Sequence, residues 1–141
     1  MNLYLDASVI VPAFIDEPTS ASVTRLIDTL VRPALLSDFS AGEFVSAISR
    51  RYRMALLTLE GAQAKLADFE RWSDIVARPL PILTTDIAAA TALVRRFELK
   101  LRLPDATHLA VCQRRGLTLA TLDDQLANAA RALGVAHIVP A

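Results

Sequence analysis

Four acidic residues lie at positions where a purely structural acid is less expected. Asp6 follows a short apolar run, and Asp123 follows a second run near the other end of the chain. Asp105 comes directly after Pro104, and Glu43 lies among small residues just before an apolar helical stripe. Taken singly, each acid also fits a helix cap or a solvated surface position, because acids are favoured near helix N-termini.

Taken together, the four acids predict a site for a hard cation. In a parallel α/β domain, strand ends and the helix starts that follow them converge on one edge of the sheet. Two like charges about 4 Å apart repel by about 4 kcal/mol at an effective dielectric constant of 20. Such a cluster needs either protonation or a bound ion, and oxygen ligands select Mg²⁺ or Mn²⁺. A pair of these ions suits phosphodiester hydrolysis, because one helps to generate hydroxide and the other stabilises the leaving oxygen.

The elements that must position the acids are short apolar runs alternating with amphipathic helical patterns. The expected strands cover residues 3–6, 34–36, 117–121 and 135–139, with a further extended segment at 80–83. The expected helices begin near residues 7, 16–20, 38, 58, 84 and 104, and a last helix ends at Gly134. This alternation predicts one α/β domain over residues 1–141, with a mostly parallel sheet of four to five strands and helices on both faces.

Residue spacing also predicts helix boundaries and inward faces. The helix that begins near residue 58 is expected to close at Pro79. The helix after residue 38 is expected to bury Val45 and Tyr52, and the helix after residue 84 to bury Phe97. Gly116 is expected to end the helix that follows Pro104.

Composition narrows the class of protein further. The chain has 141 residues, 53% of them hydrophobic, which favours one globular domain over disorder. Fifteen basic residues balance fifteen acidic ones, so an RNA substrate would need a local basic patch or a metal ion for attraction. The single cysteine, Cys112, excludes an intramolecular disulfide and a thiolate zinc site and is expected in the core. Without a secretory signal or a membrane-length apolar stretch, we expect a cytoplasmic protein.

Two histidines and one arginine are secondary candidates. His108 lies three residues after Asp105, so both are near one helix face. A metal-ligand role is open to His108, but its apolar neighbours favour a structural or hydrogen-bonding one. His137 is expected to be structural. Arg102, close to Asp105, is the best single residue for a phosphate contact.

At the four acids the chain resembles the PIN-domain ribonucleases, and most closely the VapC-type toxins of bacterial toxin–antitoxin pairs. The matching segments are Tyr4–Ser8, the helix that carries Glu43, Leu103–Ala110 and Thr121–Ala127. They occur in the family's order and span the whole chain.

The resemblance implies a four-acid site made of Asp6, Glu43, Asp105 and Asp123. It implies Mg²⁺ or Mn²⁺ dependence, endonucleolytic cleavage of RNA, inhibition by a small cognate antitoxin and a homodimer. Ser8 and Thr121 match hydroxyl positions that help to hold the site in many members. Two departures are Thr107, where leucine is common, and Asp124, an extra acid. We assign the ligand role to Asp123 because it is nearer the strand end.

Two other functions fit parts of the pattern. A phosphoacceptor domain of the receiver type also gathers acids at strand ends, but it needs a lysine on a late strand, and no lysine follows Lys100. An inactive PIN-like module that only binds RNA or protein is disfavoured because all four acids are present.

Overall fold

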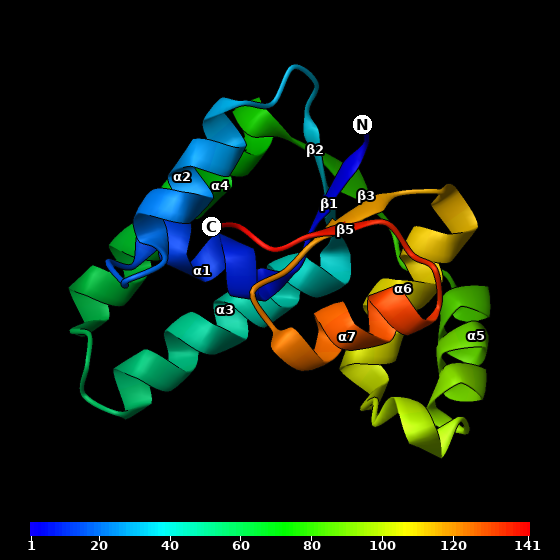
Figure 1. The fold of residues 1–141 in the computed structure, drawn as a ribbon. Helices are drawn as coiled ribbons and strands as arrows, with labels where there is room; N and C mark the ends of the chain where they lie inside the picture. Colours follow the sequence, from blue (N-terminus) through cyan, green and yellow to red (C-terminus); the bar gives the residue numbers. More distant parts are fainter.

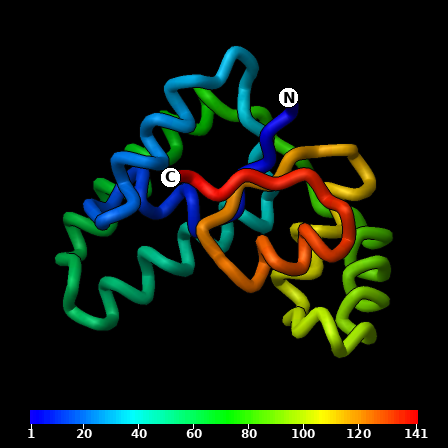
Figure 2. The backbone as a smooth tube through the Cα atoms, in the orientation of Figure 1, coloured from blue at the N-terminus to red at the C-terminus, as the bar shows by residue number.

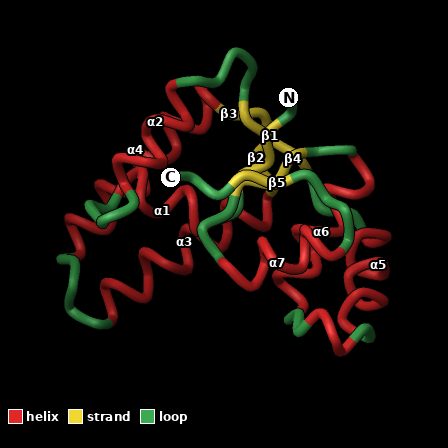
Figure 3. Tube along the Cα trace, viewed as in Figure 1, coloured by secondary structure: helices red, strands yellow, loops and turns green.

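Five short parallel strands form the centre of the computed structural model, which describes all 141 residues (Figures 1 and 3). The strands are β1 (Leu3–Leu5), β2 (Ala34–Ser37), β3 (Ala77–Leu80), β4 (Thr118–Ala120) and β5 (His137–Ile138). Their order in the sheet is β3-β2-β1-β4-β5, and every neighbouring pair is parallel. The carboxyl ends of all the strands therefore share one edge, with β1 at its middle.

The helices cover both faces of this sheet, as the alternating pattern predicts. They are α1 (Ala7–Phe14), α2 (Ser20–Asp28), α3 (Asp38–Arg53), α4 (Leu59–Val76), α5 (Thr84–Val94), α6 (Leu103–Arg115) and α7 (Asp124–Ala132). One core lies between the sheet and α1–α4, and it takes Leu3 and Leu5 of β1. The other lies between the sheet and α5–α7, and it takes Tyr4. Figure 1 shows the two helix groups on opposite sides of the strands.

Several helix boundaries confirm the sequence expectations. The Ser37 hydroxyl caps α3 by accepting a hydrogen bond from the Ser40 amide, and Thr58 caps α4 in the same way through Gly61. Gly116 ends α6 with φ +61°, in the left-handed region that suits glycine. Cys112 is a buried core residue, as expected. None of the helices combines the length and apolar character needed to cross a membrane.

Two boundary predictions were wrong. The strand lies at Ala77–Leu80 rather than 80–83, because this segment pairs in register with all of β2 and so ends α4 at Val76. Pro79 is tolerated there since β3 is an edge strand. Helix α5 ends at Val94, and a short 3₁₀ turn directs Leu99, rather than Phe97, into the core.

The inward faces also needed correction. Phe97 is 84% exposed. On α3, Val45 and Tyr52 are exposed, while Phe44 and Ile48 supply the buried stripe. Val45 is rotated by about 100° from Phe44 around the helix and so falls outside this stripe. Tyr52 continues the four-residue spacing, but it lies in the last turn of α3, where the side chain is exposed.

Candidate active site

Asp6 is held at the carboxyl end of the central strand by two hydroxyl groups. Its backbone is still extended, and the residue is 6% exposed. Its Oδ2 atom accepts hydrogen bonds from Ser8 Oγ at 2.7 Å and Thr121 Oγ1 at 2.8 Å. Asp6 occupies the N-cap position of α1, yet its carboxylate makes no capping hydrogen bond. The geometry therefore disfavours the interpretation of Asp6 as a helix cap.

The same two hydroxyls join the β1–α1 and β4–α7 connections. Ser8 Oγ accepts a hydrogen bond from the Leu122 amide at 2.9 Å, and Thr121 Oγ1 accepts one from the Asp123 amide at 3.0 Å. One oxygen of Asp6 is thus fixed by both connections. The other, Oδ1, faces His108 Nε2 at 3.3 Å.

Glu43 and His108 complete a compact cluster with Asp6. His108, on α6, is 1% exposed, and its Nε2 atom lies 2.6 Å from Glu43 Oε1. The three donor atoms, one from each residue, all lie within 4.8 Å of one another. The Glu43 side chain is 32% exposed, so the cluster opens to solvent on the side of α3.

A buried hydroxyl network supports His108 from behind. The Tyr4 hydroxyl lies 2.6 Å from His108 Nδ1, 2.8 Å from Ser37 Oγ and 3.2 Å from Ser40 Oγ. Burial raises the pKa of Tyr4, so the phenol stays protonated. Burial alone would lower the pKa of His108, but its hydrogen bond with Glu43 and the charges of Asp6 and Glu43 outweigh burial and raise that pKa.

Asp105 and Asp123 lie beside this cluster rather than in its compact group. Asp105, in the first turn of α6, is buried, and its burial and the negative charge of Asp123 raise its pKa. Asp123 caps α7, because its Oδ1 accepts hydrogen bonds from the backbone amides of Gln125 and Leu126, at 2.9 and 3.1 Å. Asp124 is exposed in the first turn of the same helix. The Asp123 backbone amide is bonded to Thr121 Oγ1, one of the hydroxyls that hold Asp6.

The basic residues differ in their availability to a substrate. The Arg102 side chain is 82% exposed, and its Nε atom lies 3.8 Å from Asp105 Oδ2. Arg114 makes two hydrogen bonds to buried Asp86, at 2.7 and 2.9 Å. Arg102 is thus an exposed cation only loosely paired with Asp105, whereas Arg114 is committed to the fold.

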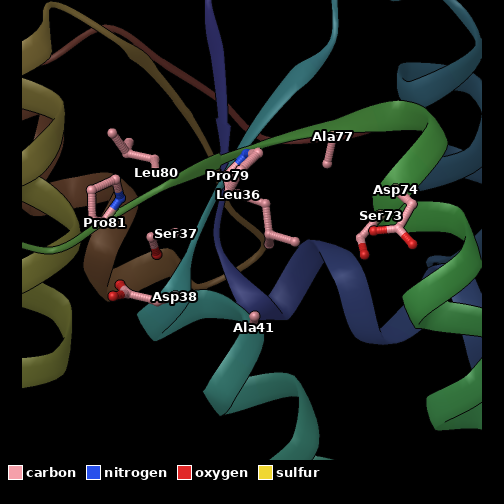
Figure 4. A pocket seen from close by; sticks show the side chains of 10 residues that line it. All are labelled: Leu36, Ser37, Asp38, Ala41, Ser73, Asp74, Ala77, Pro79, Leu80 and Pro81. Atoms are coloured by element: carbon pink, nitrogen blue, oxygen red, sulfur yellow. The ribbon is translucent and has the colours of Figure 1, made fainter.

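A pocket of about 380 Å³ lies against β2 and β3, between the start of α3 and the end of α4 (Figure 4). Asp38 and Ala41 border it on one side, and Ser73 and Asp74 on the other. The four acids do not line it. The acid cluster is therefore a separate feature of the sheet edge.

The sequence left a metal-ligand role open to His108 but favoured a structural or hydrogen-bonding one, and nothing in it connected Tyr4 with the acids. The three-residue spacing from Asp105 to His108 was the available signal, since it puts both on one face of α6. Nothing in the sequence indicated that Glu43, 65 residues away, would meet the imidazole.

Fold and site together define a nuclease-like α/β domain, and comparisons with known proteins give its family. The PIN domain model matches residues 3–132. Ribonuclease VapC46 of Mycobacterium tuberculosis is 31% identical over 141 residues, covering 98% of this chain and 97% of its own. The chain therefore belongs to the PIN-domain family and, within it, to the VapC-type ribonuclease toxins.

Solved structures support the same fold. The chain is similar to VapC20 of Mycobacterium tuberculosis, a sarcin–ricin loop cleaving toxin, with a TM-score of 0.78, 20% identity and coverage of 99% of this chain and 100% of that one. It is also similar to a chain of a toxin–antitoxin complex from Klebsiella pneumoniae, with a TM-score of 0.60, 21% identity and coverage of 87% of both chains. The PIN architecture expected from the sequence is thereby confirmed.

Proposed function

We propose that this protein is a Mg²⁺- or Mn²⁺-dependent endoribonuclease and the toxin of a toxin–antitoxin pair. The observation that carries the proposal is the convergence of Asp6, Glu43 and His108 at the carboxyl edge of the sheet, with Asp105 and Asp123 next to them. Membership in the VapC-type family supports the reaction class.

The chemistry of the side chains fits a hard cation. The acids offer carboxylate oxygens, which Mg²⁺ and Mn²⁺ prefer. The raised pKa of Asp105 reflects burial and negative charge that Arg102, at the long distance of 3.8 Å, does not offset. Asp6, Glu43, Asp105 and Asp123 would hold the metal, which supplies water activation and charge neutralisation when bound.

The residues of the chain have distinct roles in this proposal. Asp6 is the most rigid ligand, because two hydroxyls fix one of its oxygens. Glu43 is more exposed and suits the orientation of the attacking water. Asp105 is a second direct ligand and Asp123 completes the metal site, while Arg102 contacts the RNA phosphate from outside.

We also propose a cognate antitoxin as the protein partner, together with a homodimer. The Klebsiella pneumoniae relative was solved as a toxin–antitoxin complex, which supports a partner of this kind. The tip between α3 and α4 points away from the sheet in Figure 2 and exposes Tyr52, Met54, Leu56 and Leu59. Apolar patches of this sort commonly mark protein-binding surfaces.

The test compares purified wild-type protein with Asp6→Asn on RNA, with Mg²⁺ or Mn²⁺ and with EDTA. We expect cleavage to fall by about 100-fold or more in the variant, since the best-held ligand loses its charge. Asp16→Asn is the matched control, because Asp16 is exposed and lies outside the cluster. Induced expression should arrest growth for the wild type and the control only. Cleavage at the wild-type rate by Asp6→Asn, or in EDTA, would refute the assignment.

A further inference from the structure

We propose that His108 is itself a metal ligand and that its imidazole makes this site prefer Mn²⁺ over Mg²⁺. The inference rests on the proposed function and names the ion that the site selects. The proposed metal site differs from a purely carboxylate site because one of its donors is a nitrogen atom from α6.

The spacing of the donor atoms fits coordination. An octahedral ion with bonds of about 2.1 Å holds neighbouring donors about 3 Å apart. His108 Nε2 lies 2.6 Å from Glu43 Oε1 and 3.3 Å from Asp6 Oδ1. These two distances lie on either side of this separation of about 3 Å. Asp105 and Asp123 lie outside the compact group. The donor closest to both Asp6 and Glu43 is thus a nitrogen.

The network behind the imidazole is the support that a ligating histidine needs. Metal-bound histidines almost always donate their second ring N–H to a fixed acceptor, which sets the tautomer and the ring orientation. Here Nδ1 faces the Tyr4 hydroxyl at 2.6 Å. When Nδ1–H donates to that oxygen, the phenol can donate to Ser37 Oγ at 2.8 Å, and the lone pair of Nε2 points at the two carboxylates. The ring need not move: the Tyr4 hydroxyl rotates, and the incoming cation displaces into solvent the proton that Nε2 donates to Glu43 in the metal-free protein.

A mixed nitrogen and oxygen donor set discriminates between the two ions. Mg²⁺ strongly prefers oxygen ligands and keeps its water shell, whereas imidazole suits transition metals. Mn²⁺ combines tolerance for nitrogen with affinity for carboxylate oxygens. A buried imidazole placed between Asp6 and Glu43 should therefore favour Mn²⁺.

The test is pulsed electron paramagnetic resonance on the full chain loaded with Mn²⁺, combined with calorimetric titration of Mn²⁺ and Mg²⁺. We expect nitrogen coupling to the bound ion in the wild type, changed by ¹⁵N-histidine labelling and absent in His108→Gln. This variant should bind Mn²⁺ at least about tenfold more weakly, with a smaller loss for Mg²⁺. Tyr4→Phe should keep the coupling yet weaken Mn²⁺ binding by about tenfold or more. His137→Gln is the matched control and should change neither readout.

The outcomes separate this inference from the proposed function. Mn²⁺ bound without nitrogen coupling, or equal losses for both ions in His108→Gln, would overturn the role of His108 and leave the nuclease assignment standing. If His108→Gln fails to fold, the isotope-labelled wild-type protein still shows whether histidine nitrogen binds the ion. Absence of any metal binding by the wild type, together with absence of RNA cleavage, would overturn the proposed function instead.

Discussion

Replacing Thr121 by valine should show how strongly the fold depends on holding Asp6. The Thr121 hydroxyl is fully buried, donates to Asp6 Oδ2 at 2.8 Å and accepts from the Asp123 amide at 3.0 Å. Valine keeps the shape and removes both hydrogen bonds. A hydrogen bond to a charged group contributes about 1.5–3 kcal/mol, and an unpaired amide adds a further cost. Because Ser8 still donates to Asp6, we expect a loss of about 2–3 kcal/mol in the free energy of unfolding.

The assay is thermal and urea unfolding in EDTA, so that metal binding does not contribute. For a domain of this size, about 2–3 kcal/mol corresponds to a Tm lower by about 6–9 °C. Thr107→Val is the matched control, since Thr107 is equally buried but its hydroxyl donates only to a carbonyl of the preceding helical turn, at 2.7 Å. We expect that control to lose less than about 1 kcal/mol. If Thr121→Val unfolds no more easily than Thr107→Val, the Thr121 hydroxyl does not hold Asp6.

Three further predictions concern charge. Asp86→Asn should cost about 1–2 kcal/mol near neutral pH, because it breaks a pair between a buried acid and the partly exposed Arg114. Burial alone would raise the pKa of Asp86, but Arg114 and a backbone amide lower it. The stabilisation by Asp86 is therefore full above the pKa of about 3.9 that an Asp has in the unfolded chain, and it is lost as the pH falls through the lower pKa of the folded protein. In urea unfolding, the free energies of unfolding of the variant and the wild type should therefore become equal in acid. Asp105→Asn should raise the Tm of the metal-free protein by a few degrees while RNA cleavage falls, since burial and Asp123 disfavour the Asp105 charge; an unchanged or lower Tm would contradict this. Mn²⁺ at about 100 times its Kd should stabilise the wild type by about 2.7 kcal/mol, and a thermal shift of equal size in Asp6→Asn would count against Asp6 as a ligand.

Local signals in the sequence predicted the scaffold of the site well. The helices expected to begin near residues 38 and 58 do so, and the hydroxyls of Ser37 and Thr58 cap them. The apolar run at the start of the chain predicted a strand over residues 3–6, which β1 (Leu3–Leu5) confirms, and a core lies on either side of that strand. These features depend on neighbours within a few residues, so the sequence alone contains the information that decides them.

The errors have nonlocal causes. The boundary of β3 is set by its pairing with β2, some 43 residues earlier, and nothing near Pro79 indicates it. Phe97 continues an apolar helical period, yet the chain turns before it and buries Leu99 instead. The contact of Glu43 with His108 depends on how α3 and α6 pack at the sheet edge. Spacing along one helix cannot supply the distance between two helices.

The alternation of side chains along β1 explains why one histidine can serve the whole cluster. Successive strand residues point to opposite faces, so Leu3 and Leu5 enter the core of α1–α4, whereas Tyr4 enters that of α5–α7. Asp6 keeps an extended backbone and follows Tyr4 by two positions, so both lie along the face that α6 covers. The Tyr4 hydroxyl contacts Nδ1 of His108, and Asp6 lies near Nε2. The strand thus places a neutral hydroxyl and a carboxylate beside the two nitrogens of one buried ring. A helix could not offer this two-residue spacing on one face, which is why the site depends on the end of a strand.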